Sequence, residues 1–260
     1  MALRHTAIRI EVSRLDPHSG KFVVKEYSVR MPKYATVLDA LLEIKGTQDA
    51  TLSLRYSCRM GICGSCGMVI NGRPVLACQS HLSSYSGKIS VGPMLGQPVL
   101  RDLVDDFDDF FEKHRRIKPW IIAEKRVKFG SGEGARQSRE NVESILPFAS
   151  CIKCGLCLDA CPVVNSNPAF IGPQALAQEH RLMLDSRDSA RSERLELVDT
   201  KNGIWGCEFI GACSDVCPKG VDPALAIQEM KVEAIKNQIF GLRSGKRSRR
   251  ARVRGAGGAK

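Results

Sequence analysis

The sequence predicts an α+β protein in which a small domain of strands around one helix precedes a mostly helical domain. Apolar and polar side chains alternate with the period of strands in roughly the first hundred residues, and apolar side chains follow helical spacing later. The length of 260 residues suits two domains. We expect a first domain over residues 1–105, a connecting helix and linker over 106–144, a helical domain over 145–240 and a basic tail over 241–260.

The first domain begins with a predicted β-hairpin. Residues 6–15 and 22–29 each alternate apolar and polar side chains, and turn-forming residues separate them. Thr36, followed three residues later by Asp39, is typical of a helix cap and predicts a helix over residues 37–45, ended by Gly46. Around a cysteine-bearing loop at 58–66, further strands are expected over residues 67–70, 74–78 and 88–91.

The remaining segments are predicted to be helices and connections. Residues 101–122 are expected to form one amphipathic helix, whose acidic side chains from Asp102 to Glu112 face solvent. The glycine-rich segment 124–141 is expected to be a linker. Helices are predicted over residues 173–186 and from Pro223, capped by Asp222, to about Phe240. Trp205 is expected in the core rather than in contact with a ligand.

The eleven cysteines are expected to bind metal rather than form disulfides. No apolar run approaches the ~20 residues that cross a bilayer, and the N-terminus lacks the apolar core of a signal peptide. The chain is therefore expected to stay in the cytoplasm, where thiols are kept reduced. An odd number of cysteines also argues against a disulfide framework.

The net charge of +11 is concentrated at the C-terminus. Residues 241–260 hold eight basic and no acidic side chains, which leaves about +3 for the rest of the chain. We expect a disordered tail that aids solubility. Attachment to anionic lipid is a second interpretation, and nucleic-acid binding a remote third.

The first cysteine group has the spacing of a plant-type 2Fe–2S ferredoxin. Cysteines follow one another at intervals of five and three residues, and a fourth lies further on, giving the set Cys58, Cys63, Cys66 and Cys78. The loop also holds glycines that permit positive φ, so that backbone N–H groups can point at the sulfurs: Gly61, Gly64 and Gly67. A zinc site is the less favoured alternative, because such sites usually pair two short knuckles across a longer gap.

The second group begins with a bacterial ferredoxin run, in which the fourth cysteine binds the other cluster of a pair. The run ends at Cys161-Pro162, and a matching ending occurs at Cys217-Pro218. We therefore predict a 4Fe–4S cluster held by Cys151, Cys154, Cys157 and Cys217.

The third group is the same run with one ligand missing. Ile210 stands where the second cysteine belongs, so only three thiolates remain for this site: Cys161, Cys207 and Cys213. A cubane that lacks one ligand tends to lose that iron, and a 3Fe–4S cluster is predicted. One negative ligand fewer should also make this cluster easier to reduce.

These motifs together resemble the iron–sulfur subunit of succinate dehydrogenase and fumarate reductase, or respiratory complex II, closer to the fumarate-reductase branch. The resemblance covers roughly residues 6–240 and rests on five segments in the same order. They are residues 57–67, 151–162, Phe-Ile-Gly-Pro at 170–173, Asp-Ser-Arg-Asp at 185–188, and Cys213 to Lys219.

The resemblance implies a β-grasp 2Fe–2S ferredoxin-like domain followed by an all-α bacterial-ferredoxin-like domain. It implies a flavoprotein partner subunit with FAD, membrane anchor subunits and a quinone, with the chain at the cytoplasmic face of the cell membrane and no nucleic acid. Electrons would pass through the three clusters between FAD and quinone. No dinucleotide fingerprint occurs, so no substrate-converting site is expected on this chain.

The resemblance also implies tentative quinone contacts. Gln228 and Lys231 share one helix face, and Pro162 and Ile210 flank the three-iron site. The stretch 163–167 lacks the tryptophan of the ubiquinone-reducing branch, and Glu208 stands where that branch has a histidine. Menaquinone is therefore expected.

Two other hypotheses remain open from the sequence. One is a relay subunit of a soluble fumarate reductase, which a co-purifying hydrophobic anchor would exclude. The other is a zinc-binding nucleic-acid protein that uses the basic tail, which visible iron–sulfur absorbance would exclude. Neither the physiological direction nor the number of anchor subunits is encoded in the sequence.

Overall fold

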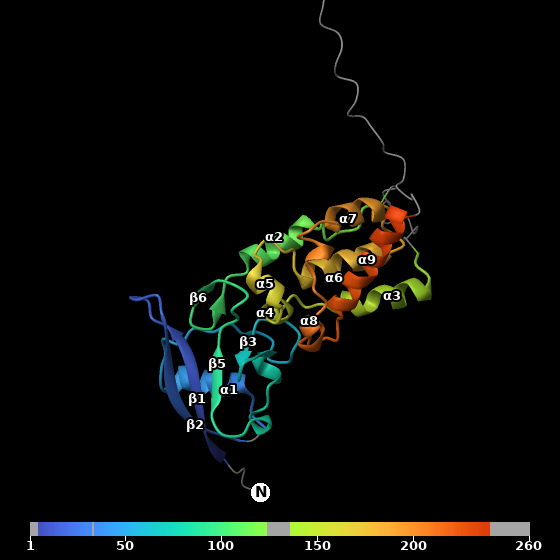
Figure 1. Ribbon diagram of the computed structural model, residues 1–260. Helices are drawn as coiled ribbons and strands as arrows, with labels where there is room; N and C mark the ends of the chain where they lie inside the picture. The colour runs from blue at the N-terminus through green and yellow to red at the C-terminus, as the bar shows by residue number, and fades with distance from the viewer. Residues whose placement is uncertain (1–4, 33, 124–135, 240–260) are drawn as a thin grey trace, which may run out of the picture.

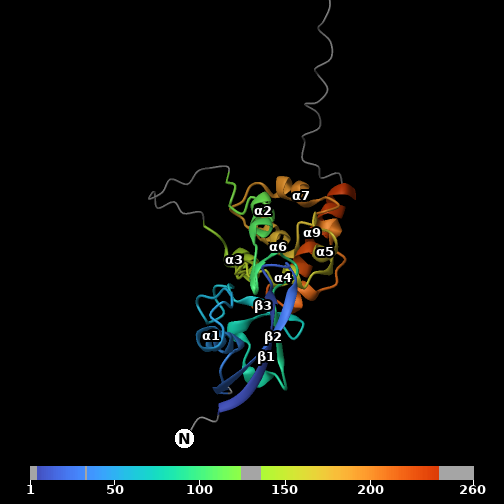
Figure 2. The ribbon, with the colours of Figure 1, turned by 90° about the vertical axis from the view of Figure 1, so that its left-hand side faces the viewer.

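A computed structural model describes residues 5–32, 34–123 and 136–239. A sheet domain and a helical domain lie end to end in an elongated molecule (Figures 1 and 2). The predicted basic tail at 241–260, and most of the predicted linker at 124–141, fall outside the described residues.

The N-terminal domain is a five-stranded mixed sheet with one helix against it. Its strands have the order β2-β1-β5-β3-β4, and β1 runs parallel to β5. Helix α1 buries Leu38, Leu41 and Ile44 in the core that it shares with the sheet. The elements are β1 (His5–Leu15), β2 (Phe22–Pro32), α1 (Val37–Thr47), β3 (Gly67–Ile70), β4 (Arg73–Leu76) and β5 (Ile89–Gly92).

The local predictions for this domain are largely confirmed. The hairpin of β1 and β2 forms, and Thr36 and Asp39 make the expected capping box. Helix α1 continues past Gly46 to Thr47, because a glycine destabilises a helix but does not forbid it. Strand β4 ends at Leu76, and Cys78 lies in a short 3-10 turn instead of the strand.

The predicted helix over residues 101–122 is wrong. The chain instead forms a small hairpin of β6 (Val99–Arg101) and β7 (Val104–Asp105), and then a shorter helix α2 (Asp108–Arg116). Asp102 is at the turn with a φ of 48°, which excludes a helix through it. Asp102 and Asp105 are also buried, so the expected solvated acidic face does not include them.

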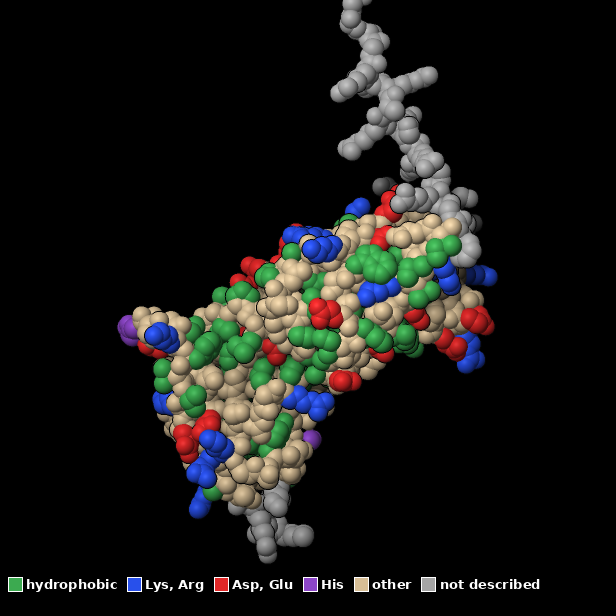
Figure 3. Space-filling view, in the orientation of Figure 1, with side chains coloured by type: hydrophobic (Ala, Val, Ile, Leu, Met, Phe, Trp, Pro, Cys, Tyr) green, Lys and Arg blue, Asp and Glu red, His purple; other side chains and the backbone are tan. Residues whose placement is uncertain are grey.

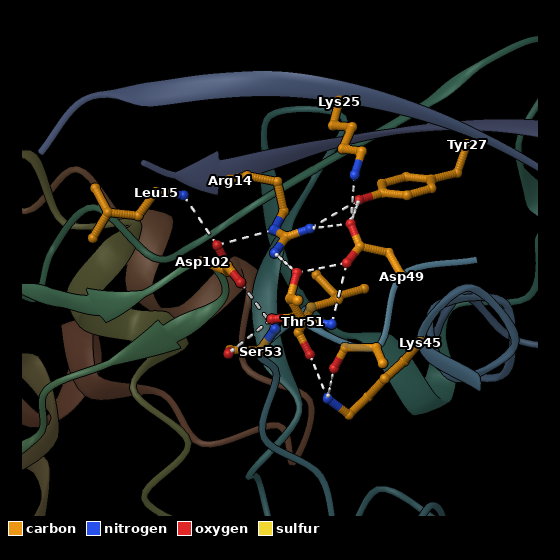
Figure 4. Close-up of polar contacts among 11 residues, drawn as sticks. Arg14, Leu15, Lys25, Tyr27, Lys45, Asp49, Thr51, Ser53 and Asp102 are labelled. Atoms are coloured by element: carbon orange, nitrogen blue, oxygen red, sulfur yellow. Dashed lines mark hydrogen bonds and ion pairs between the residues drawn. The ribbon is translucent and has the colours of Figure 1, made fainter. Parts of the chain in front are cut away.

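Contacts from distant parts of the chain hold Asp102 in this turn (Figure 4). Its carboxylate accepts hydrogen bonds from the N–H of Leu15 (3.1 Å) and of Ser53 (2.9 Å), and it pairs with the Arg14 guanidinium at 3.0 Å. Arg14 also pairs with Asp49 at 2.7 Å. One arginine thus ties the end of β1 to two later segments.

The C-terminal domain is built around helix α6. This helix packs against α3, α7 and α9, and ten of its twelve residues are buried. Ser138 caps α3 by accepting from the N–H of Asn141, so α3 begins inside the segment predicted as linker. Asp222 caps α9 as predicted. The helices are α3 (Arg139–Ala149), α4 (Leu156–Asp159), α5 (Pro162–Ser166), α6 (Pro173–Leu184), α7 (Arg191–Val198), α8 (Ala212–Asp215) and α9 (Pro223–Ile239).

A buried ion-pair group fastens the segment after α2 to this domain. Arg194 on α7 pairs with Asp188 at 2.7 Å and Glu179 at 3.2 Å, and it donates to the carbonyl oxygens of Ile117 and Trp120. Burial raises the pKa of Glu179 to about 7, because the loss of hydration outweighs the opposing effect of the Arg194 charge.

Candidate iron–sulfur cluster sites

The loop before β3 turns its backbone amides toward one sulfur. Gly61 and Gly64 have φ of 69° and 76°, which let the loop curl without steric strain. N–H groups donate to Cys58 Sγ over 3.5, 3.3 and 3.2 Å, from Met60, Ile62 and Cys63 respectively. Such amides stabilise the negative charge of a thiolate and of a cluster bound to it.

The four cysteines of this group differ in exposure, from a solvent-exposed side chain to buried ones. Cys63 is exposed and Cys58 half-buried, whereas Cys66 and Cys78 are buried. The backbone N–H of Cys58 lowers the pKa of Cys63 to about 6, and burial raises the pKa of Cys66 to about 12. Cys66 therefore becomes a thiolate only when a metal charge compensates for its lost hydration, which suits a cluster ligand.

The two later cysteine runs fold in the same way. In each run, a residue with positive φ and then a glycine with positive φ precede a four-residue helix, α4 or α8. The paired φ values nearly coincide: 55° at Lys153 and 57° at Phe209, 82° at Gly155 and 83° at Gly211. Ile210 therefore occupies the place in the second run that Cys154 occupies in the first.

The cysteines from these runs line two separate hollows. The larger, of about 410 Å³, is lined by Cys151, Cys154, Cys157 and Cys217. The smaller, of about 310 Å³, is lined by Cys161, Cys207 and Cys213, with Pro162 and Ile210 in its wall. Each hollow thus takes one cysteine from the other run. Within the described ranges no three His, Cys, Asp or Glu side chains are grouped to hold a single metal ion.

Both hollows are poorly hydrated around their thiols. Burial raises the pKa of Cys154 and of Cys213 to about 11, and it also raises the pKa of Cys157. Thiols in such surroundings stay protonated unless a cation replaces the proton. The donor set fits iron, which binds thiolates and supplies that positive charge.

A glutamine amide approaches the first cysteine of each run. Gln174 on α6 places Nε2 4.0 Å from Cys151 Sγ, and Gln228 on α9 places Nε2 4.0 Å from Cys207 Sγ. Gln174 was not predicted from the sequence, because only the fold brings α6 to Cys151. Lys231 donates from Nζ to the carbonyl oxygen of Cys207 at 2.7 Å.

Trp205 lies at the surface, so the prediction of a core position is wrong. The side chain is 42% exposed, and its Nε1 donates to Asp199 at 2.6 Å. Lys231 Nζ lies 5.8 Å from the centre of the indole ring. The polar edge of the indole therefore has a partner at the surface, and the ring lies beside a lysine that is hydrogen-bonded to Cys207.

The fold and the cysteine sets define an electron carrier with iron–sulfur domains. A family model for the 2Fe–2S iron-sulfur cluster binding domain matches residues 9–112, and a model for the 4Fe–4S dicluster domain matches residues 148–221. These matches confirm the predicted order of a 2Fe–2S domain followed by a helical ferredoxin domain.

Comparison with known proteins identifies relatives within this class of electron carriers. The fumarate reductase iron–sulfur subunit of Haemophilus influenzae is 40% identical over 245 residues, covering 90% of this chain and 96% of that protein. The succinate dehydrogenase iron–sulfur subunit of Paracoccus denitrificans is 37% identical over 226 residues, covering 86% of each chain. A chain of the Mycobacterium smegmatis Sdh1 complex superposes with a TM-score of 0.82 at 29% identity, covering 91% of this chain and 98% of that one.

This chain belongs to the family of iron–sulfur subunits of fumarate reductase and succinate dehydrogenase. It is the electron-transfer member of an oxidoreductase complex, as the motifs predicted. Among the described helices, none combines the length and apolar character needed to span a bilayer.

Proposed function

We propose that this chain relays electrons between a flavoprotein subunit with FAD and a membrane quinone, through three clusters bound by all eleven cysteines. The crossed sharing of cysteines between two matched runs carries this proposal, since it supports four ligands at one hollow and three at the other. The sets are Cys58, Cys63, Cys66 and Cys78 for 2Fe–2S, Cys151, Cys154, Cys157 and Cys217 for 4Fe–4S, and Cys161, Cys207 and Cys213 for 3Fe–4S.

When bound, these clusters supply one-electron carriers in series. The chain holds them in fixed positions, keeps water from the buried sulfurs and directs three backbone amides at the half-buried sulfur of Cys58. The absence of a thiolate at Ile210 leaves the third site with one negative ligand fewer than each of the other two, which favours its reduction. Substrate conversion belongs to the flavoprotein partner.

The quinone is proposed to bind beside the smaller hollow, where Pro162 and Ile210 form its wall. Lys231 is half-buried there and can donate a hydrogen bond to a quinone carbonyl, and Gln228 lies one helical turn earlier. Exposed apolar side chains lie at this site: Phe209 and Ile210 line the hollow, and Trp205 lies beside Lys231. Figure 3 shows hydrophobic patches on the face of the helical domain that carries α9. Menaquinone is the proposed quinone.

Lys231→Met tests the quinone role in the assembled complex. We expect a raised KM or a lost rate with menaquinol, while electron flow from the flavoprotein to an artificial acceptor persists. Lys236→Met, on an exposed part of the same helix, is the matched control. Unchanged quinol kinetics in Lys231→Met would remove this residue from the site.

The complex is proposed to lie at the cytoplasmic face of the cell membrane, held by anchor subunits. The basic residues of segment 241–260 suit contact with anionic lipid. Truncation before residue 241 should then lower binding to anionic vesicles, and co-purification of a hydrophobic anchor would separate this arrangement from a soluble fumarate reductase.

A further inference from the structure

Gly64 brings the first cysteine loop into direct contact with the second cysteine group. A Cβ atom placed on Gly64 would lie 2.8 Å from Cys154 Cβ, closer than such atoms approach in folded proteins, and 3.0 Å from Cys154 Cα. We infer that Gly64 is a positioning residue for electron transfer between the first two clusters, an inference that rests on the ligand sets proposed above.

Further contacts between the two domains surround the contact of Gly64 with Cys154. Gly67 also faces the second group, since a Cβ there would lie 3.2 Å from the carbonyl oxygen of Cys154. Leu156 is fully buried in the core of the N-terminal domain, although it belongs to α4. Asp159, at the end of α4, accepts from the N–H of Gly96 at 3.0 Å. Figures 1 and 2 both show α4 at the junction of the two domains.

The contact makes a short route between two ligand sets. Gly64 follows Cys63 directly in the chain, so one covalent step and one contact separate Cys63 from Cys154. With both clusters bound, one electron would pass from the reduced first cluster to the oxidised second cluster, and no bond would be made or broken. Because tunnelling decays steeply with distance, a side chain that separates the loops should slow this transfer.

The left-handed φ of Gly64 is by itself a sufficient reason for a glycine, so the test needs a control with the same backbone. Gly61 provides it, with a φ of 69° in the same loop. The three atoms nearest to a Cβ on Gly61 all belong to the side chain of Gln79, the closest being Cδ at 2.9 Å, and that side chain can move. Gly61→Ala and Gly64→Ala therefore share the backbone strain, and only Gly64→Ala pushes against Cys154.

The experiment compares Gly64→Ala, Gly61→Ala and Gly67→Ala in the assembled complex. Electron paramagnetic resonance (EPR) of the fully reduced protein measures magnetic coupling between the first two clusters, and freeze-quench EPR measures transfer between them. Gly67→Ala presses on Cys154 without positive φ, so it decides the outcome if Gly64→Ala does not take up the first cluster.

We expect weaker coupling and several-fold slower transfer in Gly64→Ala and Gly67→Ala, with both clusters present, and wild-type coupling in Gly61→Ala. Wild-type coupling and transfer in Gly64→Ala and Gly67→Ala would overturn the inference, as would an equal loss in Gly61→Ala. If the wild-type protein showed no 2Fe–2S or 4Fe–4S signals, the proposed ligand sets would fail first, and this inference with them.

Discussion

Ile210→Cys should convert the proposed three-iron site into a four-iron site. Ile210 follows a left-handed residue and precedes a left-handed glycine, as Cys154 does, and it lines the hollow with the three cysteines. A cysteine at this position therefore presents its sulfur without rearrangement of the backbone. The side chain of Ile210 is 57% exposed, so shortening it should cost less than about 1 kcal/mol of folding free energy.

The expected gain is one iron atom per chain. Iron analysis should show it, and the EPR signal of the oxidised three-iron cluster should disappear from Ile210→Cys, with a lower reduction potential because a thiolate has been added. Ile210→Ala is the matched control, since it shortens the side chain without adding a ligand. A folded Ile210→Cys protein that kept the three-iron signal and a free thiol would refute the equivalence of Ile210 and Cys154.

Three further predictions concern buried polar groups. Gln174→Leu removes an amide near Cys151 and should lower the reduction potential of the 4Fe–4S cluster in an EPR redox titration, whereas an unchanged potential would show that this amide has no electrostatic effect. Asp102→Ala removes two hydrogen bonds and an ion pair, so the free energy of unfolding in urea should fall by about 3 kcal/mol. The pKa of Glu179 is about 7 in the folded chain, against about 4.5 when unfolded, so its contribution makes the protein less stable as pH rises from about 5 to 7. Glu179→Gln should flatten that part of the thermal unfolding profile, and an unchanged slope would contradict the raised pKa.

Features with local causes could be predicted from the sequence. The capping box of Thr36 and Asp39 spans four residues, and the cysteine intervals reflect what one tight loop can offer a cluster. The replacement at Ile210 was visible for the same reason, because the two runs can be aligned with each other.

Features with distant causes could not be predicted. The turn at Asp102 depends on partners 87 and 49 residues away, so the apolar spacing of residues 101–122 was mistaken for one helix. Trp205 was expected in the core, and its partner Asp199 at the surface gave no sequence signal. The contact of Gly64 with Cys154 joins two domains, and a glycine in a cysteine loop has a sufficient local explanation.

The central claim is that each of the two later clusters takes one cysteine ligand from the sequence run of the other. Paired cysteine substitutions test this claim most directly. EPR of the oxidised and the reduced complex should show that Cys217→Ala loses the 4Fe–4S signal and keeps the three-iron signal. Cys161→Ala should do the opposite, although each cysteine lies in the run of the other cluster. Loss of the three-iron signal alone in Cys217→Ala, with the 4Fe–4S signal intact, would contradict the account.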